Sequence, residues 1–198
     1  MRTEAMQKLT RDQLMPLEQY AKQRNDFRAK VMAHKKNRQV QIGPHATLYF
    51  EDRLTMHYQV QEMLRAERIF EEEGIQGELD TYNPLVPDGR NLKATLMLEY
   101  PDAEERSKRL QELIGVEDRA WIQVEGHEPV WAIADEDLDR ENEHKTSSVH
   151  FLRFEFSEGM ARAFKNGAGL AMGVDHPGYT AKLETPSAVR NALMKDLW

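Results

Sequence analysis

Apolar and polar residues alternate most regularly between residues 149 and 156. His150, Leu152, Phe154 and Phe156 fall on one side of this segment, and polar residues such as Arg153 fall on the other. A repeat of two is typical of a half-buried β-strand. Similar segments bounded by glycine, proline or aspartate predict further strands at 40–42, 47–50, 94–100, 121–124, 130–133, 170–174 and 179–183.

A repeat of three to four residues predicts helices between these strands. Thr10 is a predicted N-cap for a helix whose narrow apolar face is Leu14, Leu17 and Tyr20. Further helices are predicted at 26–36, 53–73, 101–113, 135–143, 157–167 and 186–197. The order of elements predicts an α+β fold in which antiparallel sheets are packed by several helices. We expect one compact domain over 1–198, with a helical part at 1–38 and a mixed α/β body at 39–198.

Glu67 occupies an unusual place in the longest of these helices, predicted between Asp52 as N-cap and Gly74 as the residue after its end. Its apolar stripe consists of Met56, Val60, Met63, Leu64 and Phe70. Glu67 falls at the centre of that stripe. A carboxylate facing a core has to be paired, bound to a metal or protonated, because an unpaired buried charge costs several kcal/mol. The alternatives are a buried Glu–Arg pair, a metal ligand and an acid–base residue.

His150 is the second candidate for chemistry, because it shares the apolar face of its predicted strand. A single core histidine is more often a hydrogen-bonded neutral ring than a ligand. The alternative is a metal or catalytic site in which Glu67 and His150 act, with His57, His144 and His176 as further candidate ligands. Such ligands suit iron, manganese or zinc, and the sequence does not choose among these metals.

The composition excludes several classes of protein. The chain has no cysteine, which excludes disulfides, thiolate nucleophiles and an iron–sulfur cluster held by its own thiolates. The sequence also lacks a phosphate loop, a dinucleotide fingerprint and a Gly-x-Ser-x-Gly elbow. No segment approaches the roughly 20 apolar residues that span a bilayer, and the first ten residues lack the apolar core of a signal peptide. We therefore expect a cytoplasmic protein without membrane insertion.

A basic run lies between Phe27 and Phe50, where no acidic residue occurs. Lys35, Lys36 and Arg38 in this run could attract an anion or an acidic partner. Nucleic-acid binding through 28–38 is one interpretation, but the net charge of −7 and the few aromatic residues in the run favour a solvated or acid-paired face. A second possible anion site follows the Pro-Asp-Gly turn, where Arg90 and Lys93 are close in sequence.

Several long segments resemble one bacterial family, called domain of unknown function 3501. They are HKKNR at 34–38, GPHATLYFEDRLT at 43–55, YQVQEMLRAERIFEEEGI at 58–75, YNPLVPDGRNLKATLMLEY at 82–100 and TSSVHFLRFEF at 146–156. The resemblance implies no activity and no catalytic residue. It implies a context, because members are often encoded beside a rubrerythrin-like protein and an iron–sulfur protein of the heterodisulfide-reductase-related type.

These observations lead to three hypotheses. The first is an accessory protein of an iron-dependent redox or peroxide-detoxifying system that docks on protein partners, and a homo-oligomer is compatible with it. The second is a metal-binding protein or metal-dependent enzyme that uses the histidine and glutamate candidates. The third is nucleic-acid binding through the basic run, which predicts an affinity that falls steeply as salt rises. Whether the chain catalyses any reaction stays open.

Overall fold

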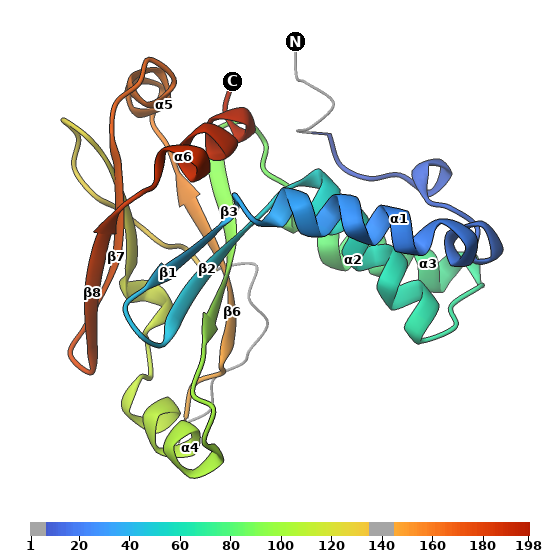
Figure 1. Cartoon of the computed structure of the whole chain (residues 1–198), viewed down its shortest axis with the longest axis horizontal. Coiled ribbons are helices and arrows are strands. Elements are labelled where there is room, and N and C mark those ends of the chain that lie inside the picture. The colour runs from blue at the N-terminus through green and yellow to red at the C-terminus, as the bar shows by residue number, and fades with distance from the viewer. Residues whose placement is uncertain (1–6, 135–144) are drawn as a thin grey trace.

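The computed structural model describes residues 7–134 and 145–198, and its strands form two four-stranded antiparallel sheets (Figure 1). The first sheet has the order β1-β2-β3-β6, with β1 at Gln39–Ile42, β2 at Ala46–Glu51, β3 at Asn91–Leu98 and β6 at Val149–Glu155. The second has the order β5-β4-β7-β8, with β5 at Val130–Trp131, β4 at Ala120–Val124, β7 at Leu170–His176 and β8 at Tyr179–Glu184.

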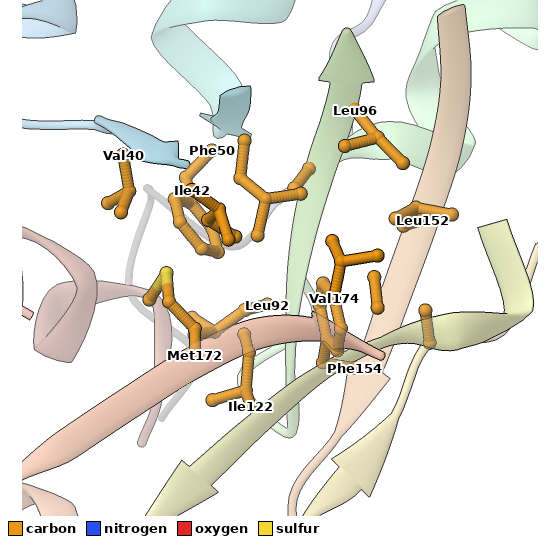
Figure 2. Packing of buried hydrophobic residues seen from close by; sticks show 14 of the residues in the cluster. Val40, Ile42, Phe50, Leu92, Leu96, Ile122, Leu152, Phe154, Met172 and Val174 are labelled. Atoms are coloured by element: carbon orange, nitrogen blue, oxygen red, sulfur yellow. The ribbon is translucent and has the colours of Figure 1, made fainter. Parts of the chain in front are cut away.

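The main core fills the space between the two sheets. Alternate residues of each strand point inward, as the repeat of two in the sequence predicts. Figure 2 shows side chains of the first sheet, such as Phe50 and Leu152, meeting side chains of the second, such as Ile122 and Met172. This packing accounts for the alternation along β6, where His150, Leu152 and Phe154 are buried.

The two sheets are also joined at their edges. The hydroxyl of Tyr179 in β8 donates to the carbonyl of Ile42 and accepts from the backbone N–H groups of His45 and Ala46, both at 3.1 Å. At the other edge, an isolated bridge pairs Ile133 with Arg153. The sheets therefore form a sandwich whose two open sides are tied by polar contacts.

Three helices form a helical layer beside the first sheet (Figure 1). They are α1 at Leu17–Lys35, α2 at Arg53–Ala66 and α3 at Glu72–Tyr82, and 3₁₀ turns at Arg11–Gln13 (η2) and Asn83–Leu85 (η3) accompany them. A second hydrophobic cluster holds this layer together, and it includes Leu9, Leu14, Met56, Val60, Leu64, Ile75, Leu79 and Leu85. The helical part predicted at 1–38 is thus extended by residues 53–85.

Short helices close the ends of the sandwich. These are α4 at Ala103–Glu112, α5 at Glu158–Lys165 and α6 at Ser187–Leu193, with 3₁₀ turns at Glu117–Arg119 (η4) and Met194–Asp196 (η5). The side chains of Asp102 and Ser157 cap α4 and α5 by accepting from the N–H groups of Glu105 and Met160. Within the described residues, no helix is both long and apolar enough to cross a bilayer.

The predicted α+β class and antiparallel strands are confirmed, and three helix predictions are wrong in their boundaries. The helices predicted from Thr10 and at 26–36 are instead the turn η2 followed by one continuous helix, α1. The helix predicted at 53–73 ends at Ala66 as α2, Arg68 then adopts a left-handed φ of 56°, and a separate helix, α3, begins at Glu72. The helix predicted at 135–143 lies outside the described residues.

Candidate functional site

The outward face of the first sheet carries polar side chains in register. Glu51 of β2 is opposite Lys93 of β3, and Lys93 is opposite Arg153 of β6. The neighbouring row consists of Tyr49, Thr95 and Phe151. These positions alternate with the inward-facing core residues, so they project toward the helical layer. Glu51, Lys93 and Thr95 are nonetheless buried, which is unusual for charged groups.

A cavity of about 390 Å³ lies between this face and the helical layer. Its sheet wall comes from β2, β3 and β6, and its other walls come from the end of α1, from α2, from the end of α3 and from η3. The lining residues are Lys35, Tyr49, Glu51, Met56, Gln59, Tyr82, Leu85, Thr95, Met97, Val149 and Phe151. An apolar surface with a few converging polar groups is typical of small-molecule sites, which usually measure about 300–1,000 Å³.

Glu51 is the charged residue of the cavity lining that is buried. The residue is only 6% exposed, and one carboxylate oxygen, Oε1, accepts a 2.8 Å hydrogen bond from the hydroxyl of Thr95. The other oxygen, Oε2, is buried without a hydrogen-bond partner among the described residues. A buried polar atom without a partner costs about 1–3 kcal/mol, and more when it is charged. The Glu51 carboxylate is therefore ready to accept a donor from a bound molecule.

Lys35 and several neutral polar groups share the cavity with Glu51. Lys35 is the last residue of α1, is partly buried, and its ammonium contacts no hydrogen-bond or ion-pair partner among the described residues. On the helical side, the amide of Gln59 lies 3.5 Å from the hydroxyl of Tyr82. The hydroxyl of Tyr49 donates to Glu99 at 3.1 Å, and burial together with that carboxylate raises the pKa of Tyr49. At neutral pH the Tyr49 hydroxyl is therefore a donor.

A buried arginine fixes the backbone that carries Glu51. Arg38 is 2% exposed and donates to the carbonyls of Phe50 at 3.1 Å and Glu51 at 3.3 Å. Its guanidinium also pairs with Asp196 of η5 and lies 3.4 Å from the carboxylate of Asp52. The Arg38 charge is thus compensated by this chain, and its donors hold the end of β2 in place.

Two carboxylates around Arg38 have opposite pKa shifts. Burial raises the pKa of Asp196 to about 6, although Arg38 opposes the shift. Burial also acts to raise the pKa of Asp52, but a 2.5 Å hydrogen bond to His34 and the charge of Arg38 outweigh it and leave that pKa below its usual value. Asp52 also caps α2 by accepting from the N–H of Thr55. This cluster links α1, β2, α2 and the C-terminal turn.

The prediction that Glu67 faces a core is wrong. Glu67 is exposed and is the C-cap residue of α2, because that helix ends at Ala66. The left-handed Arg68 then turns the chain, so Phe70 does not continue the α2 stripe and is 66% exposed. Solvent hydrates the Glu67 carboxylate, so this residue needs no buried partner, metal or proton.

His150 is buried in the core, as its place in the sequence predicts, and its ring has local partners. Its Nε2 atom lies 2.9 Å from the hydroxyl of Thr146 and 3.0 Å from the carbonyl of Ser147. The same atom is 3.9 Å from a carboxylate oxygen of Glu117. His150 faces the space between the sheets, on the opposite side of the first sheet from the cavity. His150 is therefore a core histidine whose ring is hydrogen-bonded within the chain.

The other candidate metal ligands are dispersed through the described part of the chain. His176 lies at the end of β7, where Nε2 contacts the carbonyl of Ile114 at 3.0 Å and Nδ1 accepts from the N–H of Gly178. His57 packs on Phe27 in the helical layer, and burial lowers its pKa. His144 lies outside the described residues. Among residues 7–134 and 145–198, no three histidine or carboxylate side chains are grouped closely enough to hold a metal ion.

The basic residues predicted to bind an anion or a partner have different environments. Arg38 is buried and paired with Asp196 and Asp52, which matches the acid-paired alternative and leaves its guanidinium inaccessible to an external anion or partner. Lys36 is exposed, whereas Lys35 lines the cavity. Arg90 lies over the ring of Trp198, 5.1 Å from its centre. Lys93 is buried on β3, between Glu51 of β2 and Arg153 of β6. Nucleic-acid binding through 28–38 stays a prediction, now with fewer accessible cations.

The outer face of the second sheet is a second candidate binding surface, and it lies on the side of the molecule opposite the helical layer (Figure 1). Trp121 and Trp131 are opposite each other on β4 and β5, and Trp131 is 43% exposed. Arg119 lies 5.3 Å from the centre of the Trp131 ring. A groove of about 490 Å³ is lined by Trp121, Pro129, Trp131, Val174, Asp175, Thr180, Ala181 and Lys182.

The sequence interpretation missed Glu51 as a functional candidate. A signal was present, because Thr47, Tyr49 and Glu51 alternate with Ala46, Leu48 and Phe50 and must share the outward face of β2. The sequence of β2 alone does not show that this face is buried, because the helices that cover it lie elsewhere in the chain. These are α1, which precedes β2, and α2, which follows it. Lys35 was identified, but only as part of a basic run.

The comparisons with known proteins identify a family and a solved relative. The family model described as "Protein of unknown function (DUF3501)" matches residues 8–197. A crystal structure titled as a novel protein of unknown function from Burkholderia pseudomallei K96243 is similar, with 52% identity and a TM-score of 0.92, over 96% of this chain and 100% of that chain. The search of curated proteins found no match. Because the family model matches almost the whole chain, this protein belongs to the DUF3501 family.

Proposed function

We propose that the protein is a receptor for a small, partly apolar molecule that binds in the cavity between the first sheet and the helical layer. The observation that carries the proposal is the buried, unpartnered Oε2 atom of Glu51 at the cavity wall. A donor on the bound molecule would satisfy this atom and would regain a charge-assisted hydrogen bond, which contributes about 1.5–3 kcal/mol.

The rest of the lining is suited to an apolar group of the ligand, next to the donor that binds Glu51. Met56 and Leu85 of the helical layer face Met97, Val149 and Phe151 of the sheet across the cavity. Burial of apolar ligand surface here contributes about 25 cal/mol per Å². The polar groups fix the orientation, and the apolar walls supply affinity.

The test compares a variant that fills the cavity with one that does not. Val149→Phe adds bulk at the cavity wall, whereas Gln41→Phe places the same side chain at the exposed end of the same row of the sheet. The proteins are dialysed to equilibrium against a defined mixture of primary amines, amino acids, carboxylic acids and nucleosides, and retained compounds are identified by mass spectrometry. We expect donor-bearing compounds to be retained by the wild type and Gln41→Phe but not by Val149→Phe.

Two results would count against this function. One is a wild-type protein that retains no compound from the mixture. The other is equal retention by wild-type protein and Val149→Phe, which would place binding elsewhere on the molecule. Circular dichroism spectra and urea midpoints of both variants show whether the comparison is made between folded proteins.

A second candidate function is the accessory role in an iron-dependent redox or peroxide-detoxifying system, through protein partners. The exposed Trp131 and the groove beside it favour this candidate, because aromatic side chains and arginine are enriched at protein interfaces. The proposed partners, a rubrerythrin-like protein and an iron–sulfur protein, come from the family resemblance. The oxidative-stress role belongs to this candidate, whereas metal binding is the separate hypothesis based on the histidine and glutamate candidates.

A pull-down with the rubrerythrin-like protein of the same organism tests this second candidate. We expect a complex at low salt that Trp131→Ser weakens, and that Gln23→Ser, in an exposed part of the helical layer, leaves unchanged. Absence of a complex at low salt would contradict the accessory role with this partner and would leave the cavity proposal untouched.

A further inference from the structure

We infer that the ligand of the cavity is a zwitterion of the amino-acid class, whose ammonium group binds Glu51 and whose carboxylate binds Lys35. This inference rests on the proposed function. It goes further by using the two formal charges of the cavity lining, one of each sign, which come from different elements. Glu51 lies on the sheet wall at the end of β2, and Lys35 lies at the end of α1.

Neither charge is compensated by an opposite charge across the cavity. No ion pair joins Lys35 to Glu51 in the described part of the chain, and no other described residue accepts from the Lys35 ammonium. Glu51 has Thr95 as its hydrogen-bond donor, and its second oxygen has none. A ligand with one charge of each sign provides a donor for Glu51 and an acceptor for Lys35, whereas a simple amine or a simple acid provides only one of the two.

Arg38 makes this arrangement rigid without competing for the ligand. It follows Lys35 by three residues, and its donors hold the carbonyls of Phe50 and Glu51. Asp196 and Asp52 already compensate the charge of Arg38, so we expect the ligand carboxylate to bind Lys35 and not Arg38. Arg38 is therefore a positioning residue that keeps the end of α1 and the end of β2 in register. Preorganised charges lose less free energy on binding than mobile ones.

The apolar walls indicate the side chain of such a ligand. The Met97 and Phe151 side chains on the sheet and the Met56 and Leu85 side chains on the helical layer can surround an aliphatic or aromatic group. Methionine adapts its shape to irregular neighbours, so both kinds of group are compatible with these walls. We therefore expect an amino acid or a close derivative with an apolar side chain.

The experiment uses two matched sets of probes on the full chain. The first set is L-leucine, 3-methylbutylamine, which lacks the carboxylate, and 4-methylpentanoate, which lacks the ammonium. The second set is L-phenylalanine, 2-phenylethylamine and 3-phenylpropanoate. Isothermal titration calorimetry measures each affinity. We expect at least one zwitterion to bind about tenfold or more tightly than both of its partial analogues, because each of them loses one charge-assisted contact.

Variants assign each charge to its partner. Glu51→Gln should weaken the zwitterion and the amine about tenfold or more and leave the acid unchanged. Lys35→Met should weaken the zwitterion and the acid and leave the amine unchanged. Lys36→Met is the matched control, because Lys36 is the exposed neighbour of Lys35, and it should change none of these affinities. If a variant fails to fold, the comparison of probes on the wild-type protein decides the inference alone.

The outcomes separate this inference from the function on which it rests. An amine that binds as tightly as its zwitterion, with dependence on Glu51, overturns the zwitterion and keeps the cavity as a receptor site. The same holds if no probe of either set binds while dialysis recovers another compound that Val149→Phe excludes. Tight binding of a zwitterion that neither Glu51→Gln nor Lys35→Met changes overturns the assignment to this cavity.

Discussion

At the scale of the residue, Arg38 and Glu51 illustrate two ways in which this chain buries a charge. Arg38 is surrounded by carboxylates and carbonyls, so its guanidinium is compensated by the protein and serves the structure. Glu51 has a single donor, Thr95, and an oxygen without a partner. The first arrangement is complete and the second is not, which is why the second is the candidate for binding.

Asp196 provides a prediction about pH. Its pKa in the folded protein is about 6, whereas the ordinary value for aspartate is near 4, because burial disfavours the charged form. The folded state therefore binds this proton more tightly than the unfolded state. The contribution of Asp196 to stability is full below about pH 4 and is lost as pH rises through 6. The free energy of unfolding of Asp196→Asn should fall less than that of the wild type over this range.

Urea denaturation of both proteins at several pH values measures this difference, with an expected size on the order of 1–3 kcal/mol. The ¹³C chemical shift of the Asp196 carboxyl gives its pKa directly. Parallel stability curves for the two proteins would contradict the raised pKa, whatever the offset between them.

Gly173 provides a prediction about packing. A Cβ atom at this position would lie 2.6 Å from the carbonyl oxygen of Ala181 and 2.7 Å from the ring of Trp121. The nearest obstacle is backbone, so the strand itself has to move. Gly173→Ala should lower the free energy of unfolding by about 1–3 kcal/mol and change the tryptophan fluorescence.

Gly77 is the matched control for this substitution. It lies inside α3, and a Cβ added there meets no atom within 4 Å. Gly77→Ala should raise the free energy of unfolding by up to about 1 kcal/mol, because alanine favours helix more than glycine does. Equal effects of the two substitutions would show that the close contact at Gly173 is not a constraint.

At the scale of the element, strands were more predictable from the sequence than helices. The alternation along β6 and the turn glycines of the hairpins depend on local geometry, so the sequence displays them directly. The break between α2 and α3 is different, because Arg68 is an ordinary helix former and carries no breaker signal. Packing of α3 on α2 favours the turn, and that packing is a tertiary effect.

Arg68→Gly tests the break by the sign of its effect. Because Arg68 has a left-handed φ of 56°, glycine should remove strain and raise the free energy of unfolding by up to about 1 kcal/mol. In a continuous helix the same change would lower it by about 1 kcal/mol. Arg65→Gly, three residues earlier in the last turn of α2, is the control and should be destabilising.

At the scale of the whole molecule, the cavity exists because two hydrophobic clusters pack separately. One cluster fills the sandwich and the other holds the helical layer, and the polar outward face of the first sheet lies between them. Its lining combines residues from 35 to 151, so no local pattern in the sequence could reveal it. The sequence predicted the class of fold and the inward faces. It did not predict which outward face would be covered.

Binding in this cavity should stabilise the folded protein as a whole. A ligand that binds only the native state adds about 2.7 kcal/mol at a concentration of 100 times its Kd. The compound retained most tightly in dialysis should therefore raise the melting temperature of the wild type and Gln41→Phe by a similar amount. Val149→Phe should show little change, and a rise equal to that of the wild type would contradict binding at this site.

The most direct measurement of the central claim is a crystal structure of the protein with that compound bound. We expect electron density for the ligand between the first sheet and the helical layer, with a donor nitrogen about 2.7–3.2 Å from Oε2 of Glu51. Density for the ligand at another surface, with the cavity filled by water alone and Glu51 Oε2 bonded to that water, would contradict it.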